Sequence, residues 1–395
     1  MKKILYICDQ SPFGNSYGSQ QRTNLLFNLL CEKGHVDLIC FTSVIKPQSG
    51  FNPNCTIKYF YELPVKTRTK MGIHFEKLLN IFFSFSPYSV FRKNSEARKN
   101  THGLIQNNNY DYIVLRYLKN AFVCGLSKDK RIIVDVDDLP EQAIISYANS
   151  AKLSALRYML YWFYAKRAKF HTNRFLKGIG HSFFSNESQC KWQNSSYLPN
   201  IPFPFPGTNS INLISTSEDT NHSLLFVGLM NYSPNSDGVD YFIKNIWGNI
   251  KGKIPGAVFR IAGDGVSLHQ KATWEKFEGI KVLGFVPDIY KEYKECKAVV
   301  VPVYYGAGTN IKVLEAMSMK RVPVISEYSA KAFKNDLVDY KNVLVATDDK
   351  DFANKTIQLL LDEKLNADIA NNGVKTIQDK YSYSLFKESV NRYLT

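Results

Sequence analysis

Apolar positions follow two periods along most of the chain. Short runs of β-branched and aromatic residues are followed by stretches whose apolar residues recur every three or four positions. Runs of the first kind are typical of buried parallel strands, and stretches of the second kind of amphipathic helices. Strands are predicted at residues 3–8, 36–41, 112–116, 131–136, 223–227, 258–262, 281–285, 298–303 and 322–325. This rhythm predicts an α/β fold with parallel sheets.

A proline-rich stretch divides the chain. Residues 195–206 contain four prolines, and the polar residues 207–222 follow, a composition typical of a linker. At 395 residues the chain is long enough for two domains with full cores. We therefore expect one α/β domain on each side of this stretch.

The cysteines indicate the redox environment of the protein, and the distribution of charge indicates the kind of partner it binds. The seven cysteines are scattered without a C-x-x-C pair, which argues against a disulfide framework or a zinc site and fits a reducing cytoplasm. The first apolar run is too short for a secretory signal because Asp9 interrupts it. Residues 1–200 hold 27 Lys+Arg and 13 Asp+Glu (27 − 13 = +14) of the net +15. This basic half indicates an anionic partner.

The stretch 300–326 carries the most specific chemistry. A strand leads into Gly306-Ala307-Gly308, and a helix is predicted from residue 311, with Thr309 or Asn310 as a capping side chain. A glycine loop before a helix N-terminus is an anion site, and Lys312 adds a full charge. Glu315 follows one turn later and can accept hydrogen bonds from a diol such as ribose. The pattern also fits an ordinary strand–loop–helix unit with Glu315 in solvent.

The segment GAGTNIKVLEAMSMKRVPVIS closely resembles the donor-binding segment of retaining GT-B glycosyltransferases of the family 4 type (glycosyl transferases group 1). This resemblance implies two Rossmann-like domains facing across a cleft, with a C-terminal helix that crosses back to the first domain. The corresponding boundaries are 1–205, 206–378 and 379–395. It also implies a nucleotide-sugar donor, no metal and no other cofactor.

The resemblance assigns roles to individual residues. The donor-binding residues that it implies are Gly306, Gly308, Thr309, Asn310, Lys312, Glu315, Val286 and Gly228. Val286 lies in a GFVPD loop that touches the nucleobase through backbone groups in the family. Many members carry an Arg and a Lys in the loop after Gly228; this chain has neither and is closer to a subgroup with PN-x-D-G. The phosphates therefore depend more on Lys312, which we also expect to stabilise the leaving diphosphate.

The first domain offers acceptor-side candidates. Three candidates follow the strand predicted at residues 3–8: Gly14 and Gly18 in the loop after it, and Arg22 in the helix that begins next. Their position suggests an acceptor-side role. Alternatively, they belong to a structural turn with a solvated Arg22. Asp137 and Asp138 follow the strand at 131–136, where a carboxylate could orient or deprotonate an acceptor hydroxyl as a catalytic residue, or cap the next helix. With Asp135 they also suggest a metal, but no histidine supports one.

Two segments interleave basic and aromatic residues, at 64–100 and 152–177. The uncharged part of the first, residues 78–91, is too short to span a bilayer. The first segment could lie on a bilayer surface or line a pocket for a lipid-linked acceptor, and the second could rest on anionic lipid. Either could instead be a core helix with a solvated face or flanks. The sequence of these segments is compatible with each of these interpretations.

The combined interpretation is a retaining glycosyltransferase. It would move a sugar from a nucleotide diphosphate to a glycan or lipid-linked acceptor, in bacterial surface polysaccharide synthesis, in the cytoplasm or peripherally on the inner face of the membrane. A sugar-nucleotide epimerase and a non-catalytic sugar-nucleotide-binding partner remain alternatives. A nucleic-acid partner is not expected, because no helix-turn-helix, RNP or zinc pattern accompanies the basic half.

Overall fold

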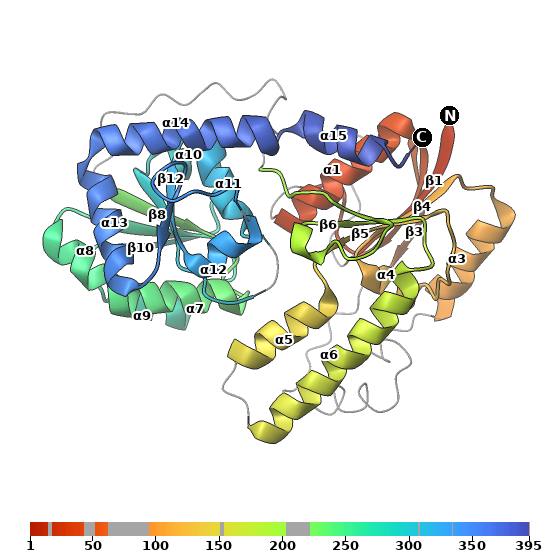
Figure 1. Ribbon diagram of the computed structural model, residues 1–395, viewed down its shortest axis with the longest axis horizontal. Helices are drawn as coiled ribbons and strands as arrows, with labels where there is room; N and C mark the ends of the chain where they lie inside the picture. Colours follow the sequence, from red (N-terminus) through yellow and green to blue (C-terminus); the bar gives the residue numbers. More distant parts are fainter. Residues whose placement is uncertain are drawn as a thin grey trace. The chain divides into compact units, whose positions relative to one another are not determined.

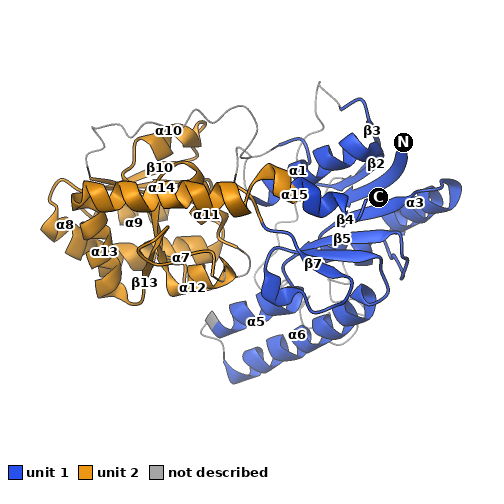
Figure 2. Cartoon of the chain, turned by 45° about the horizontal axis from the view of Figure 1, so that its top comes forward, with its two compact units in different colours: residues 1–199, 387–395 blue, residues 200–386 orange. Residues whose placement is uncertain are grey.

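The chain forms two compact units, residues 1–199 with 387–395 and residues 200–386 (Figure 2). The computed structural model describes residues 1–14, 18–42, 52–61, 95–150, 154–202, 222–306, 309–333 and 335–394. Each unit holds one parallel sheet with helices packed against it (Figure 1), so the α/β prediction is confirmed. The domain boundaries expected from the sequence stay predictions.

The first unit is built on a seven-stranded sheet in the order β3-β2-β1-β4-β5-β6-β7. Its strands are β1 (Lys2–Cys8), β2 (Gly34–Phe41), β3 (Cys55–Tyr61), β4 (Tyr112–Arg116), β5 (Ile132–Asp137), β6 (His181–Phe184) and β7 (Ser195–Tyr197). All neighbours pair in parallel, and β1 lies between β2 and β4. Residues 4–8 of β1 are fully buried, because helices cover both faces of such a sheet.

The helices of this unit are α1 (Gly18–Lys33), α3 (Ser95–Asn107), α4 (Leu118–Val123), α5 (Pro140–Ser150), α6 (Ala155–Leu176) and the short η2 (Glu187–Gln189). The pattern analysis missed β3, β6 and β7. The stretch expected to begin the linker at residue 195 instead begins with β7, an edge strand whose polar residues Ser195 and Ser196 carry no apolar signal. Residues 62–94, which include the predicted segment 78–91, lie outside the described residues.

The second unit is built on a six-stranded parallel sheet in the order β10-β9-β8-β11-β12-β13. Its strands are β8 (Ser223–Val227), β9 (Val258–Ala262), β10 (Ile280–Gly284), β11 (Ala298–Val301), β12 (Val322–Ser326) and β13 (Leu344–Ala346). Its helices are α7 (Ser233–Phe242), the π-helical η3 (Ile243–Trp247), α8 (Gly248–Lys253), α9 (Leu268–Trp274), α10 (Ile289–Lys294), α11 (Ile311–Ser318), α12 (Glu327–Ala330), η4 (Lys331–Phe333), α13 (Asp349–Leu361) and α14 (Glu363–Lys380). The central strands β8 and β11 end at the same edge, which positions the loops that follow them.

The end of the chain returns to the first unit. Helix α15 (Tyr383–Asn391) follows α14, and residues from Lys387 onward belong to the first unit. Tyr393 stacks on His181 of β6 with 3.5 Å between ring centroids, and Lys387 Nζ lies 2.5 Å from a carboxylate oxygen of Glu32. The predicted C-terminal helix that crosses back to the first domain is therefore confirmed.

The described residues were searched for membrane-spanning helices, disulfides and metal-binding groups. No helix among them is long and apolar enough to cross a membrane. All seven cysteines are free. Within the described ranges, no group of three or more His, Cys, Asp or Glu side chains is arranged to hold a metal ion.

Candidate functional site

The glycine loop of the second unit lies against two tyrosines. Gly306 has φ = 134°, a conformation that favours glycine, and a Cβ there would lie 2.9 Å from the Tyr232 hydroxyl. Tyr328 donates a hydrogen bond of 2.7 Å to the Gly306 carbonyl. Ala307 and the candidate Gly308 lie outside the described residues. The loop between β11 and α11 is thus fixed at its described end.

The residues before α11 were expected to cap that helix, and this expectation is wrong. Asn310 occupies the N-cap position, but its side chain makes no capping bond and donates instead to Ser329 Oγ at 3.2 Å. The hydroxyl of Thr309 accepts a hydrogen bond of 2.5 Å from Asn200 Nδ2. The Asn310 side chain therefore leaves the N–H groups of the first helical turn to another acceptor.

Lys312 is a buried cation. Its side chain is only 6% exposed, and Nζ donates to Asn235 Oδ1 at 2.6 Å while lying 4.4 Å from the centre of the Phe226 ring. No carboxylate in the described part of the chain lies within ion-pair distance of this ammonium. Burial lowers the pKa of Lys312 to about 7, although the charge of Glu315 acts in the opposite direction.

The candidate Gly228 lies directly against this cation. A Cβ at Gly228 would come within 3.0 Å of Lys312 Nζ and 2.7 Å of Asn235 Nδ2. The neighbouring Gly263 has φ = 146°, and a Cβ there would lie 1.8 Å from the Gly228 carbonyl oxygen. Gly228 therefore keeps space open beside the ammonium, and Gly263 lets the end of β9 approach the Gly228 backbone closely.

The PNSDG segment at the start of α7 builds this site, which the sequence analysis did not foresee. Asn235 binds Lys312, and its amide also donates to the Leu229 carbonyl at 2.9 Å. Asp237 accepts a hydrogen bond from Tyr305 of the glycine loop. Gly238 lets α7 approach the loop, since a Cβ there would lie 2.1 Å from the Pro302 carbonyl oxygen. The motif thus positions both Lys312 and the loop.

Glu315 lies one turn after Lys312 on α11 and is half-buried. The hydroxyl of Tyr293 donates to Glu315 Oε2 at 3.4 Å. Burial raises the pKa of Tyr290, and the negative charge of Glu315 raises it further. The candidate Val286 is half-buried in the turn after β10, just before Asp288 caps α10 by accepting from the Tyr290 N–H at 3.0 Å. The carboxylate can accept hydrogen bonds from a diol.

In the first unit, two arginines and three carboxylates gather at the ends of β4 and β5. Arg22 is 3% exposed and binds Asp135 through two bonds of 2.8 and 2.7 Å. Its third nitrogen donates to the Leu198 and Pro199 carbonyls at 3.0 Å each. Arg22 thus links residues 198–199, which follow β7, to Asp135 of β5. Its acceptor-side role stays a prediction.

Arg116, the last residue of β4, was not foreseen because it reads as the end of an apolar strand. It is fully buried, and its Nη2 donates to Asp137 Oδ2 at 2.7 Å. Its Nη1 lies 3.2 Å from Asp135 Oδ2. Asp137 and Tyr117 have φ values of 65° and 64°, conformations that cost energy for residues other than glycine. These carboxylates pair with arginines rather than with one another.

Asp137 and Asp138 differ in their ionisation. Burial alone would raise the pKa of Asp137, but the charges of Arg116 and Arg22 lower it to about 2. Burial raises the pKa of Asp138 to about 7, and the adjacent Asp137 charge adds to this effect. Among the described residues, the Asp138 carboxylate accepts one hydrogen bond, of 3.4 Å from Gln189 Nε2. Asp138 is therefore the carboxylate that can exchange a proton near neutral pH.

The other acceptor-side candidates are less informative. Gly14 lies where a Cβ would meet the Gln20 side chain at 2.6 Å, and Gly18 is the first residue of α1. The loop residues 15–17 between them lie outside the described residues. Their acceptor-side role stays a prediction.

Part of the chain matches a known protein family. Residues 221–362, most of the second unit, match the family of glycosyl transferases group 1. No curated protein has a matching sequence.

Solved structures of the same fold cover nearly the whole chain. Sucrose-phosphate synthase from Thermosynechococcus elongatus has a TM-score of 0.70 and 14% identity over 99% of this chain and 98% of that chain. HepE from Anabaena, in complex with UDP and glucose, has a TM-score of 0.62 and 14% identity over 100% and 99%. WaaG, a glycosyltransferase involved in lipopolysaccharide biosynthesis, has a TM-score of 0.64 and 14% identity over 98% and 99%.

At such identities these likenesses show the fold, and they confirm the predicted GT-B architecture. The family match covers the unit that holds Lys312 and Glu315. The second unit thus carries the match to glycosyl transferases group 1, and the whole chain has the GT-B fold.

Proposed function

We propose that the second unit binds a nucleotide diphosphate sugar around Lys312. The observation that carries this proposal is a buried ammonium beside a glycine, with an amide as its hydrogen-bond partner and no carboxylate of the described chain to neutralise it. A phosphate oxygen would supply the missing negative charge and raise the pKa of Lys312. The N–H groups at the start of α11 would add donors to the same anion.

The other donor contacts follow from this placement. Gly306, Gly308, Thr309 and Asn310 would surround the diphosphate, and Glu315 would accept hydrogen bonds from the ribose hydroxyls. Val286 would contact the nucleobase through its backbone, and Gly228 would leave room for the phosphate. The HepE structure contains UDP, which supports UDP as the first nucleotide to test.

The proposed reaction moves the sugar with retention. The bond between the sugar's anomeric carbon and the β-phosphate oxygen breaks, and a bond from that carbon to the acceptor oxygen forms. Lys312 would stabilise the charge that grows on the leaving diphosphate, and such preorganised contacts are typically worth about 10²–10³ in rate. Asp138 would orient the acceptor hydroxyl or take up its proton, since its pKa of about 7 suits that role.

We propose a glycan or lipid-linked acceptor on the first unit, in bacterial surface polysaccharide synthesis at the inner face of the membrane. Gly14, Gly18 and Arg22 would border the acceptor. The likeness to WaaG, whose role is in lipopolysaccharide biosynthesis, supports this class of acceptor.

The direct test is release of nucleoside diphosphate from UDP-, GDP- and ADP-sugars. We expect release from one of these donors to be slow alone and to rise when extracts of bacterial glycolipid are added. Release of the free sugar's epimer without any acceptor would indicate an epimerase instead. Tight binding of a donor with no product under any condition would contradict the proposed transfer. A matched control is the same assay with the Glu315→Ala variant.

A further inference from the structure

Helix α6 presents an unusual surface. Only its residues Ala165, Ala168, Thr172, Phe175 and Leu176 are buried. At about 100° per residue these five positions form one stripe, which is the packed face of the helix. They all lie from the middle of α6 onward, so the first two and a half turns lack a fully buried residue. Here α6 packs against α5 and extends from the sheet (Figure 1).

The face opposite this stripe is apolar. Leu156, Met159, Phe163 and Phe170 are 63%, 47%, 50% and 61% exposed. Their spacing of three, four and seven residues places them on one line, about 180° from the packed stripe. Scattered exposed apolar residues are ordinary, but large side chains aligned on one helix face indicate an interaction surface. We call these four residues the outer stripe.

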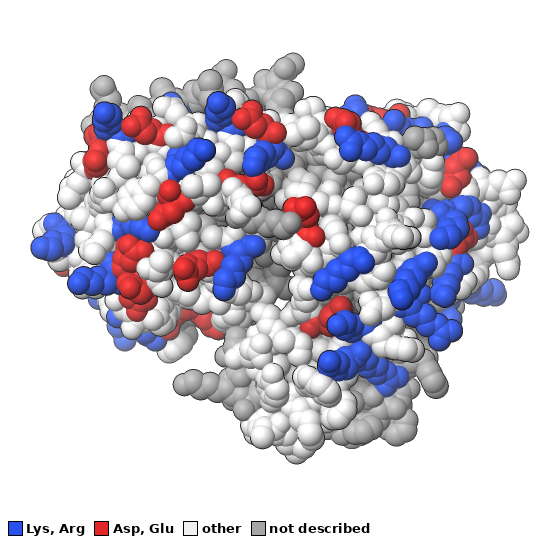
Figure 3. All heavy atoms as spheres, viewed as in Figure 1, with Lys and Arg blue, Asp and Glu red and all other residues white. Residues whose placement is uncertain are grey.

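Charge changes along the same helix. Residues 154–178 contain no Asp or Glu but six basic residues, which are Arg157, Lys166, Arg167, Lys169, Arg174 and Lys177. By the same angular count, Lys166, Arg167, Arg174 and Lys177 lie on or beside the outer stripe, all in the C-terminal half. Figure 3 shows uncharged atoms at the lower end of the α5–α6 pair and blue side chains toward its upper end.

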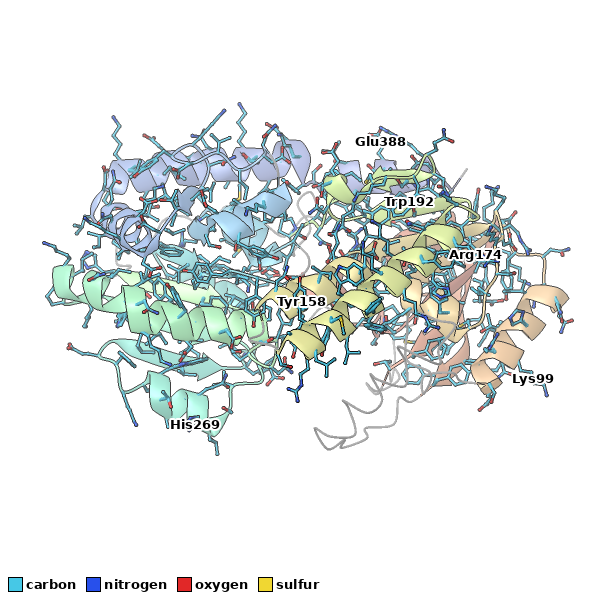
Figure 4. All side chains as sticks on the ribbon, turned by 60° about the horizontal axis from the view of Figure 1, so that its bottom comes forward. Lys99, Tyr158, Arg174, Trp192, His269 and Glu388 are labelled. Carbon is cyan, nitrogen blue, oxygen red and sulfur yellow. The ribbon has the colours of Figure 1, made fainter. Side chains whose placement is uncertain are left out.

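Aromatic and basic side chains also combine near the apolar end. Trp162 is 40% exposed, and Lys166 Nζ lies 5.0 Å from the centre of its ring. Tyr158, 41% exposed, lies on the side of α6 that faces α5, where its hydroxyl donates to Asn149 Oδ1 at 3.2 Å, and Arg174 lies near the end of the helix (Figure 4). Tryptophan and tyrosine prefer the boundary between lipid headgroups and acyl chains, and long basic side chains reach the headgroups from there.

We propose that the outer stripe of α6 is the surface with which this enzyme docks on an anionic lipid bilayer. The helix would lie in the plane of the interface, with Leu156, Met159 and Phe163 inserted and the basic residues against the headgroups. The lack of any acidic residue on α6 favours anionic lipid over a second copy of this basic chain. The inference deepens the proposed location at the membrane and rests on it, but needs no donor or acceptor.

Co-sedimentation with vesicles tests this surface. The probes are vesicles of equal parts phosphatidylglycerol and phosphatidylcholine, and vesicles of phosphatidylcholine alone, at low and high salt. We expect the wild type to pellet with the anionic vesicles and Met159→Ser/Phe163→Ser to bind at least tenfold more weakly. The matched control is Leu268→Ser/Leu361→Ser, which replaces two leucines of the second unit that are 89% and 60% exposed and should pellet like the wild type.

A second pair of variants separates charge from folding. Lys166→Glu/Arg174→Glu should lose binding at low salt, whereas Lys253→Glu/Lys276→Glu, with the same charge change on exposed positions of the second unit, should retain most of it. Circular dichroism and the thermal shift with UDP report whether each variant folds and binds donor, so failure here is distinct from failure of the proposed function.

Two outcomes would overturn the proposal. One is a wild type that does not pellet with anionic vesicles even at low salt. The other is undiminished pelleting of both α6 variants. Dimerisation of the wild type that Met159→Ser/Phe163→Ser abolishes, seen by light scattering without lipid, would assign the outer stripe to a second copy instead.

Discussion

The Lys312→Met variant should transfer sugar about 10²–10³ times more slowly than the wild type, with intact folding. Methionine keeps the length and apolar stem of the lysine but removes the charge that would meet the diphosphate. Burial of an ammonium disfavours the folded state, so its loss should leave the melting temperature unchanged or raise it. In the wild type, diphosphate affinity should fall above pH 7 as free Lys312 loses its proton. The kcat/KM for the donor and its pH profile measure both effects.

Lys355 provides a matched control in the same unit. It is also 6% exposed, but its Nζ lies 2.8 Å from Asp339 and 3.2 Å from Asp351. Lys355→Met should therefore lower the free energy of unfolding by about 1–2 kcal/mol, because two partly exposed carboxylates lose their partner, and leave kcat/KM unchanged. Equal losses of activity in the two variants would contradict the role assigned to Lys312.

Asp138→Asn should reduce the rate by about 10²–10³ while Asp137→Asn mainly reduces stability. The first removes the carboxyl that can exchange a proton near pH 7, for which losses of 10²–10⁴ are usual. The second leaves the buried Arg116 without one partner, which typically costs about 3–5 kcal/mol; Asp135 remains beside Arg116, so we expect the lower end. Steady-state rates and thermal unfolding of both variants distinguish the roles.

Stability as a function of pH gives an independent check of Asp138. Its pKa in the folded protein, about 7, lies above the ordinary value of 3.8, so the folded state holds this proton more tightly. The contribution of this proton to stability is present below pH 4 and is lost as pH rises toward 7. Asp138→Asn should remove that decline. A variant with the wild-type pH profile of stability, and with wild-type turnover, would contradict the assignment.

The sequence predicted the central strands and the β11–α11 segment closely, because buried parallel strands and a glycine loop before a helix leave local signals. The helix begins at Ile311, and β8 and β4 match their predicted limits. Strands β3, β6, β7 and β13 were missed; β7, with the sequence SSY, has no apolar run at all. Strand β11 ends at Val301, two residues before its predicted end.

The environment of each charge could not be predicted, because it depends on partners distant in sequence. Lys312 and Asn235 are 77 positions apart, and Arg22 and Asp135 are 113 apart. The sequence placed Arg22 beside the acceptor or in a structural turn, and it gave no sign that this arginine is buried and paired with Asp135. It treated Asp137 and Asp138 alike, whereas one binds Arg116 and the other does not. The PNSDG segment could have indicated the site around Lys312. Asparagine and glycine are poor helix formers, so their presence in the first turns of a helix suggests a role other than helix formation.

The most direct test of the central claim is a thermal-shift titration of the wild type and Glu315→Ala with UDP, GDP and ADP. A diphosphate at 100 times its Kd stabilises a folded protein by about 2.7 kcal/mol. We predict that one of the three raises the wild-type melting temperature and that Glu315→Ala, unchanged in melting temperature without ligand, loses this shift. No shift with any of them, or an equal shift in the variant, would contradict a nucleotide diphosphate site built on Lys312 and Glu315.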